Sequence, residues 1–172
     1  MKILIIDDEQ VSADLLRRWL VHHGYKHVQA VTDSRLALET CDQFDPDLIL
    51  LDLIMPNMDG FAILEELRSG DAGETFLPVV VLTADTSEEA KRRALEAGAT
   101  DFLQKPLDQT ESLLRIHNLL HSRRAHLLVD NRRAALEGAI RERTIELRAL
   151  RAELQACHGL AQSPSEFEGT RA

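Results

Sequence analysis

Aromatic residues are scarce in this chain, which has 172 residues and an aromatic content of 4%. Because hydrophobic residues still make up 44% of the sequence, we expect an ordered core of Leu, Ile, Val and Ala, and global disorder is excluded. The two cysteines, Cys41 and Cys157, are far apart and lack metal-ligand spacing. No apolar run is long enough for a membrane span, and no signal-peptide pattern follows Met1. We therefore expect a reduced, cytoplasmic protein that does not bind membranes.

Positive charge is also scarce in the first two thirds of the chain. The net charge is −9, but residues 1–114 carry 10 Lys/Arg and 22 Asp/Glu, a net charge of −12. Residues 115–172 carry the other 10 basic residues, all Arg, and 7 acids. An acidic domain does not favour contact with phosphate backbones, and Arg interleaved with Glu is typical of a solvated helix face. Direct binding to nucleic acid is therefore not expected.

Five short apolar runs alternate with helical patterns over the first 108 residues. This alternation predicts βαβ units and an α/β fold with a parallel sheet. The runs expected to form strands are 2–6, 27–31, 48–51, 78–82 and 101–103. The first helix is expected over 11–23, with Val11, Leu15, Leu16, Trp19 and Leu20 at helical spacing. Ser34 and Ser87 are the expected N-caps of later helices, Gly24 and Gly98 the expected stops, and 69–75 a polar loop.

From about Thr110 to Cys157 the sequence contains no Pro and favours helix throughout. One line of positions at heptad spacing, here called the seam, consists of Leu119, Ser122, His126, Val129, Arg133, Leu136, Ile140, Arg143, Leu147, Leu150, Leu154 and Cys157. A helix of roughly 70 Å outruns a small domain, so we expect a parallel coiled coil that forms a homodimer through residues 129–157. Arg143 in the seam would weaken that coil or fix its register. The alternative is an amphipathic helix folded back on its own domain.

Polar side chains follow four of the five expected strands. Asp7 and Asp8 follow the first strand, Asp52 the third, Thr83 the fourth and Lys105 the fifth. The carboxyl ends of parallel strands share one edge of the sheet, where ligands bind in open α/β folds. Crowded carboxylates are costly without a cation, and oxygen ligands of this kind suit Mg²⁺. A carboxylate beside Mg²⁺ and a Lys is equipped to act as a nucleophile toward phosphorus.

These motifs, in this order, resemble the receiver domain of bacterial two-component response regulators: Asp7-Asp8, the run 51–56 with Asp59-Gly60, Thr83-Ala84 and Lys105-Pro106. The resemblance covers residues 1–121 and implies a flavodoxin-like, doubly wound sheet of order 2-1-3-4-5. It implies Asp52 as the acceptor of a phosphoryl group from a histidine kinase or phosphotransfer protein, with Lys105 as phosphate partner. It further implies Mg²⁺ held by Asp7, Asp8, Asp52 and the Ile54 carbonyl, Thr83 and Phe102 as a switch pair, and a cis Lys105-Pro106 bond. Phe102 could instead be a plain core aromatic.

Two further expectations follow from the resemblance. Ile54 and Asp85 stand where relatives tune loss of the phosphoryl group, and because an apolar Ile54 cannot orient water, we expect slow self-dephosphorylation. Residues 141–147 resemble the helical linkers that join receivers to output modules such as cyclic-di-GMP phosphodiesterases, whose motifs this sequence does not contain.

The predicted organisation is a receiver at 1–121, a coiled-coil linker at 122–158 and a disordered tail at 159–172. The protein is expected to be a signalling switch, with no enzyme activity beyond its own phosphorylation and dephosphorylation. Two alternatives stay open: a constitutive coiled-coil adaptor, and a phosphatase with an aspartyl intermediate. Against the phosphatase, Ile54 stands where a second Asp would be needed.

Overall fold

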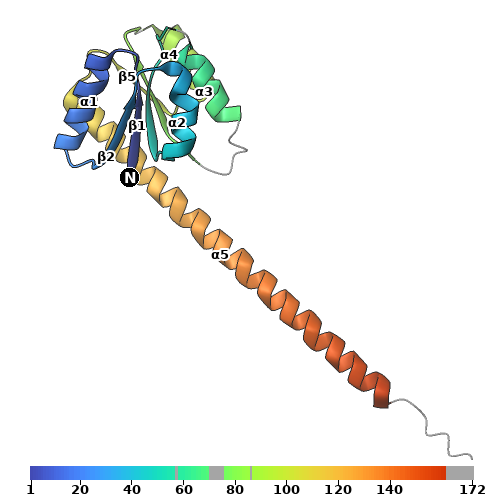
Figure 1. The fold of residues 1–172 in the computed structure, drawn as a ribbon. Helices are drawn as coiled ribbons and strands as arrows, with labels where there is room; N and C mark the ends of the chain where they lie inside the picture. The colour runs from blue at the N-terminus through green and yellow to red at the C-terminus, as the bar shows by residue number, and fades with distance from the viewer. Residues whose placement is uncertain (57, 70–75, 86, 162–172) are drawn as a thin grey trace, which may run out of the picture. The chain divides into compact units, whose positions relative to one another are not determined.

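The computed structural model describes residues 1–56, 58–69, 76–85 and 87–161, with the backbone alone at 153 and 155–161. Its centre is a five-stranded parallel sheet in the order β2-β1-β3-β4-β5, as predicted (Figure 1). The strands are β1 (Lys2–Ile6), β2 (His27–Val31), β3 (Leu48–Asp52), β4 (Val79–Thr83) and β5 (Asp101–Gln104). Because β1 and β3 are neighbours in the sheet but not in the chain, the strand order reverses between them. Such a reversal opens a crevice at the carboxyl ends of the two strands.

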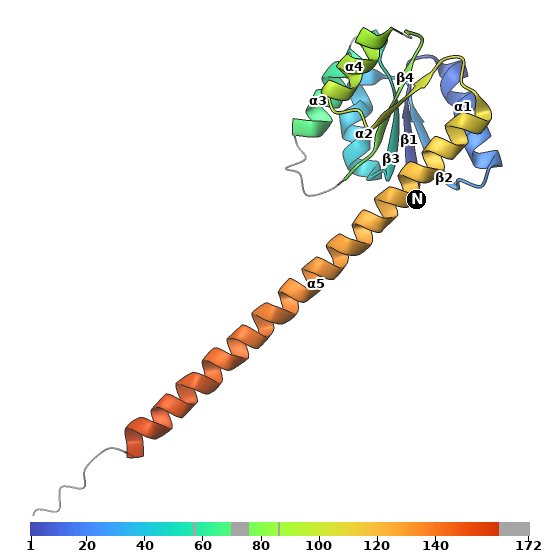
Figure 2. The ribbon, with the colours of Figure 1, turned by 180° about the vertical axis from the view of Figure 1, so that it is seen from behind.

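Helices cover both faces of the sheet (Figures 1 and 2). They are α1 (Gln10–His22), α2 (Ala37–Phe44), which follows the short 3₁₀ turn η1 (Ser34–Leu36), α3 (Gly60–Ser69), α4 (Glu88–Glu96) and α5 (Gln109–Ala161). Side chains of α2, α3 and α4 pack on one face, and those of α1 and the first turns of α5 pack on the other. Every residue of β3 and β4 is buried, since a parallel sheet covered on both faces has no solvent side.

The helix ends agree with the sequence in three places and differ in one. Gly24 and Gly98 have positive φ angles of 94° and 99°, and the Ser87 hydroxyl accepts a hydrogen bond from the Ala90 N–H, as predicted. The predicted cap at Ser34 is wrong. Asp33 accepts the hydrogen bond from the Arg35 N–H, while the buried Ser34 hydroxyl donates to the Pro56 carbonyl oxygen (2.9 Å). A carboxylate one residue earlier takes the capping role and leaves the Ser hydroxyl for a distant contact.

The inner face of α1 is shifted from the one read from its apolar residues. Ala13, Leu16 and Leu20 are buried, whereas Val11 and Leu15 are 74% and 69% exposed. A small residue at position 13 allows the helix to approach the sheet closely. Val11 and Leu15 lie on the opposite side of the helix from Ala13, at about 3.6 residues per turn, and therefore remain on the surface.

Helix α5 is continuous from Gln109 to Ala161. By its contacts the chain divides into two units, residues 1–127 and a second unit from Leu128. Within the first unit, Arg123 donates a hydrogen bond to the Phe76 carbonyl oxygen (2.7 Å), and the His126 ring lies 4.7 Å from the Phe76 ring. These contacts account for a first unit that continues past residue 121.

In the second unit, the seam side chains from Val129 to Leu154 are exposed. Pairing with a second copy stays a prediction. The tail was predicted to begin at residue 159, but the helix includes 159–161, and 162–172 lie outside the described residues, as do residues 70–75 of the predicted loop. Within the described residues, no helix has an apolar stretch long enough to cross a bilayer.

Candidate functional site

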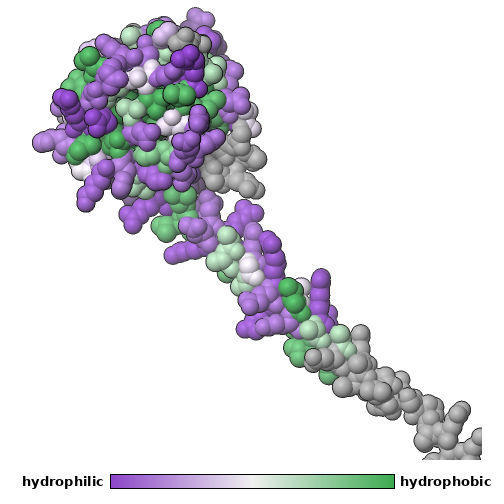
Figure 3. Space-filling model, viewed as in Figure 1, coloured by the Kyte–Doolittle hydropathy of each residue, from purple (hydrophilic) through white to green (hydrophobic). Residues whose placement is uncertain are grey.

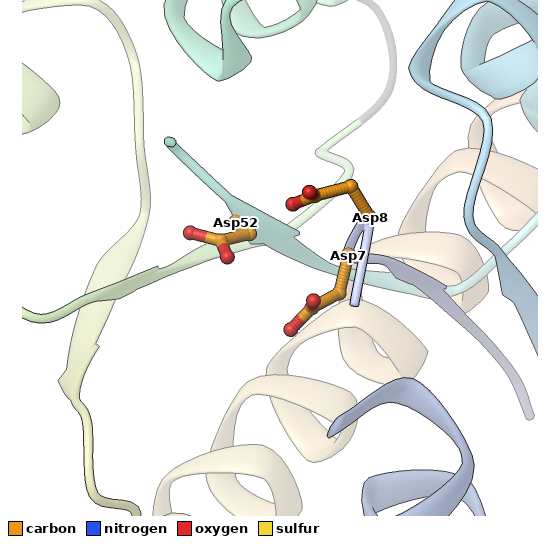
Figure 4. Close-up of side chains that lie close together, drawn as sticks. All are labelled: Asp7, Asp8 and Asp52. Atoms are coloured by element: carbon orange, nitrogen blue, oxygen red, sulfur yellow. The ribbon is translucent and has the colours of Figure 1, made fainter. Parts of the chain in front are cut away.

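Three carboxylates meet where β1 and β3 end. Asp7 and Asp8 directly follow β1, and Asp52 is the last residue of β3, which pairs with β1 in register Ile6 to Leu51. One oxygen from each carboxylate lies within 4.8 Å of the others. Figure 4 shows the Asp8 carboxylate extending toward Asp52, with Asp7 beside them. The structure therefore brings together the three acids that the sequence places at different strand ends.

The ammonium group of Lys105, which follows the edge strand β5, completes this cluster. The Lys105 Nζ lies 2.7 Å from Oδ2 of Asp52 and 2.9 Å from Oδ2 of Asp7. Lys105 follows β5, its backbone N–H donates to the Thr83 carbonyl oxygen (2.8 Å), and its peptide bond to Pro106 is cis, as the resemblance implied. Burial alone would lower the pKa of Lys105, but the hydrogen bonds to Asp52 and Asp7 together raise it above its ordinary value. The ammonium thus stays charged between two carboxylates.

The carboxylates are held in place by local backbone and hydroxyl donors. Asp7 is fully buried, and its two oxygens accept hydrogen bonds from the Glu9 N–H (3.0 Å) and the Ser12 hydroxyl (3.0 Å). Asp52 Oδ1 accepts from the Ile54 N–H (3.2 Å). Sequence reasoning did not identify Ser12. The available signal was a hydroxyl in the first turn of the helix that follows Asp7.

The donor set fits a hard divalent cation. Carboxylate oxygens within a few ångströms of one another suit Mg²⁺, which takes few protein ligands and keeps several waters. The Ile54 N–H bond to Asp52 places the backbone of that residue beside the same carboxylate. The acidic cluster could therefore hold a magnesium ion through the carboxylates of Asp7, Asp8 and Asp52.

Thr83 and Phe102, the predicted switch pair, lie on the same face of the sheet. Thr83 is the last residue of β4 and is 5% exposed, and its hydroxyl accepts a hydrogen bond from the Asp85 N–H (3.0 Å). Phe102 pairs with Val81 in β5, is half-buried against the core, and has the Lys91 Nζ at 5.4 Å from its ring centroid. The hydroxyl is engaged by the loop after β4 in this conformation, and the switch role stays a prediction.

Ile54 and Asp85, the predicted tuning residues, line one cleft of about 540 Å³ together with Thr83. The Ile54 side chain is 72% exposed in it. Hydrogen bonds from Ser87 hold the pKa of the Asp85 carboxyl below its usual value, so this side chain is a carboxylate at neutral pH. On the other side of the site, a smaller cleft of about 320 Å³ is lined by Lys105, Pro106 and Trp19.

The loop after Asp52 depends on two residues that sequence reasoning did not single out for this role. The Gly60 N–H donates to the Leu53 carbonyl oxygen (3.1 Å), and a Cβ at Gly60 would collide with the Asp52 carbonyl oxygen. The Ser34 hydroxyl anchors the same loop at Pro56. The sequence offered Asp59-Gly60 as part of the receiver motif, and it is the close approach of two backbone segments that requires Gly at position 60.

A family model and known relatives match about two thirds of the chain. The family model described as "Response regulator receiver domain" matches residues 3–117. "Response regulator MprA" of Mycolicibacterium vanbaalenii is 40% identical over 121 residues, which are 70% of this chain and 50% of that protein. The "DNA-binding dual master transcriptional regulator RpaA" of Synechocystis is 40% identical over 119 residues, 69% of this chain and 48% of that protein. The chain thus spans about half the length of these curated relatives.

Solved structures agree with this match. The receiver domain of the Francisella response regulator 1452 superposes with a TM-score of 0.65 and 29% identity, covering 70% of this chain and 97% of that one.

Proposed function

The chain belongs to the response regulator receiver family, and on that premise we propose that Asp52 accepts a phosphoryl group from a histidine kinase or phosphotransfer protein in the cytoplasm. The observation that carries the proposal is the position of the Lys105 ammonium, within 3 Å of both Asp52 and Asp7, at an edge where Asp8 adds a third carboxylate. A carboxylate nucleophile with a cation beside it is what phosphoryl transfer to an aspartate needs.

The proposed step is a displacement at phosphorus. An Asp52 carboxylate oxygen attacks the phosphorus of a phosphohistidine, the P–O bond forms as the P–N bond breaks, and the departing imidazole nitrogen keeps the electron pair and takes up a proton. Lys105 compensates negative charge on the transferring oxygens. Asp7, Asp8, Asp52 and the Ile54 carbonyl would hold Mg²⁺, which supplies further positive charge at the same oxygens when bound. Beyond this phosphorylation, the only turnover that we propose for the chain is its own dephosphorylation.

We propose that Thr83 and Phe102 read the new charge. A phosphoryl group adds acceptor oxygens at the edge where the Thr83 hydroxyl lies. If the Thr83 hydroxyl gave up its hydrogen bonds with the Asp85 backbone and donated to the phosphoryl group instead, it would free space on the face of the sheet that it shares with Phe102. Rotation of the half-buried ring would then alter the surface of α4, β5 and α5.

The output is inferred from the long helix. We propose that α5 pairs with a second copy through 129–157 and passes the state to an output module such as a cyclic-di-GMP phosphodiesterase, as residues 141–147 suggest by resemblance. RpaA is named as a DNA-binding protein, but this chain covers only 48% of RpaA, so we do not propose DNA binding for this chain.

The test is intact mass after incubation with Mg²⁺ and acetyl phosphate. The wild type should gain the mass of one phosphoryl group, and Asp52→Asn should gain nothing. Asp59→Asn is the matched control, because Asp59 is an exposed carboxylate on the same loop and lies outside the acidic cluster. Equal labelling of Asp52→Asn and the wild type would refute the proposal. Asp8→Ala should further require more Mg²⁺ for the same rate.

A further inference from the structure

An exposed apolar stripe runs along the part of α5 that belongs to the second unit. It consists of six seam residues that are each 55–65% exposed: Val129, Leu136, Ile140, Leu147, Leu150 and Leu154. Figure 3 shows hydrophobic side chains on this segment among hydrophilic ones. Aliphatic side chains repeated at heptad spacing on an exposed helix are the pattern of a coiled-coil seam.

Two arginines interrupt the stripe, and each brings its own carboxylate. The Arg133 Nε donates to the Glu137 side chain (2.9 Å), and an Arg143 guanidinium nitrogen donates to the Glu146 side chain (2.7 Å). Both glutamates stand at the heptad positions that flank the seam, Glu137 on one side and Glu146 on the other. The seam arginines are therefore partly neutralised before any partner arrives.

The flanking charges favour a second copy of this chain as the partner. In a parallel pair of identical helices, a residue on one flank faces the residue five positions later on the other flank of the partner. Arg132 would then face Glu137 of the partner subunit, and Glu146 would face Arg151 of the partner subunit. Each symmetric pair forms twice in a dimer, and no like charges meet at these positions.

We propose that the second unit pairs with a second copy of this chain in parallel and in register, held by two shared carboxylates. Glu137 bridges its own Arg133 and Arg132 of the partner subunit. Glu146 bridges its own Arg143 and Arg151 of the partner subunit. These shared carboxylates offset the approach of the two copies of each seam arginine. This inference deepens the dimer in the proposed function and depends on that part of it.

The distribution of apolar residues favours the parallel arrangement over the antiparallel one. Parallel pairing places Leu147, Leu150 and Leu154 against their own copies, which gives three consecutive aliphatic layers. An antiparallel pair over residues 129–154, in which residue 129 faces residue 154 of the partner subunit, places Leu150 against Arg133. It also places Ile140 against Arg143, so that each buried charge faces an aliphatic side chain. Four of the eight seam layers between residues 129 and 154 then contain an arginine, whereas only two of eight do in the parallel pair, so the parallel pair keeps more purely aliphatic layers.

Single-cysteine cross-linking of the full chain tests orientation and register. In a Cys41→Ser, Cys157→Ser background, Leu136→Cys and Leu150→Cys should each form a disulfide-linked homodimer on mild oxidation. Arg141→Cys, on the outer side of the helix, is the control and should not. The reaction is run with Mg²⁺ alone and with Mg²⁺ and beryllofluoride, and linking of both seam cysteines in either condition supports the proposal. In the antiparallel register, position 136 faces position 147, so linking that occurs only in a mixture of Leu136→Cys and Leu147→Cys chains would establish an antiparallel pair and overturn the proposal. A monomer by sedimentation in both conditions would also overturn the proposal.

A charge-reversal pair tests the shared carboxylates. Arg132→Glu alone and Glu137→Arg alone each place like charges across the dimer twice, so each should weaken self-association on the order of ten-fold. A mixture of the two variants restores an opposite charge at both places and should associate more tightly than either variant alone, but less tightly than the wild type, because the Glu137→Arg chain lacks the carboxylate beside its own Arg133. Association of the mixture as weak as that of either variant alone would overturn the assigned register. Phosphorylation of Asp52 is scored separately by intact mass, so a failed coil and a failed phosphoacceptor are distinguishable results.

Discussion

Replacing Gly60 by Ala should directly disturb the end of β3, where Asp52 lies. A Cβ at this position would collide with the Asp52 carbonyl oxygen and would lie 2.6 Å from the Leu53 Cα, both backbone atoms that cannot turn away. Overpacking of this kind costs about 1–3 kcal/mol, and the rigid neighbours place Gly60→Ala toward the upper end. At about 2–8 °C per kcal/mol the melting temperature should fall by several degrees.

The collision should also displace Asp52 and slow its phosphorylation strongly, although the protein stays folded. A shift of about 1 Å in a reacting group can cost on the order of 100-fold in rate, and the collision acts on the peptide of Asp52 itself. The assays are thermal unfolding by circular dichroism and the rate of mass gain with acetyl phosphate at saturating Mg²⁺.

Gly138→Ala is the matched control for this prediction. The change is chemically identical, but a Cβ at Gly138 meets no atom within 4 Å, and the residue is exposed in the interior of α5. Removing Gly from a helix interior should stabilise it by up to about 1 kcal/mol, with no change in phosphorylation rate. If Gly60→Ala melts and phosphorylates like the wild type, the argument from close backbone approach is refuted.

Three other predictions concern single side chains. The pKa of Lys105 is raised in the folded state, so its ion pairs stabilise the fold below about pH 10, and this stability is lost as the pH rises through the folded-state pKa. The difference in urea midpoint between the wild type and Lys105→Met should therefore shrink above that pH. A difference that stays constant with pH would contradict this prediction. Ile54→Asn should shorten the lifetime of the phosphorylated form several-fold, because an amide can orient water where the exposed Ile54 cannot; a longer lifetime for the variant would count against the tuning role. Burial, with Asp42 and Asp45, raises the pKa of the Cys41 thiol to about 11, so in a Cys157→Ser background it should react with a thiol reagent at pH 8 only after unfolding, and rapid labelling of the native protein would show that it is not buried.

The fold and the acidic edge were predictable because their signals are local. A bounded run such as Leu48–Leu51 indicates a buried strand by itself, and the order of such runs defines the sheet up to a handful of topologies. Asp7, Asp52 and Lys105 then follow, because the residue after each parallel strand reaches the same edge. The distances among them required the structure.

The missed features are those that depend on distant backbone. Ser34 was read as a helix cap because hydroxyls cap helices, but its partner is the Pro56 carbonyl, 22 residues away. Leu15 is apolar and stands at helical spacing, but the residues of α1 that are buried against the sheet are Ala13, Leu16 and Leu20. Likewise, no local pattern shows that His126 of the predicted seam stacks on Phe76. Spacing selects a face of a helix and does not identify the atoms that meet it.

The scarcity of aromatic residues has a practical consequence at the site. Trp19 is the only tryptophan of the chain, and it lines the cleft of about 320 Å³ that Lys105 and Pro106 also line. Among the described residues, its buried indole N–H has no hydrogen-bond acceptor, so its emission depends on the polarity of that cleft. The native protein therefore carries its own fluorescent side chain beside Lys105, the proposed phosphate partner. We expect a movement of Lys105 that changes this cleft to change the tryptophan emission, which can be recorded without a label.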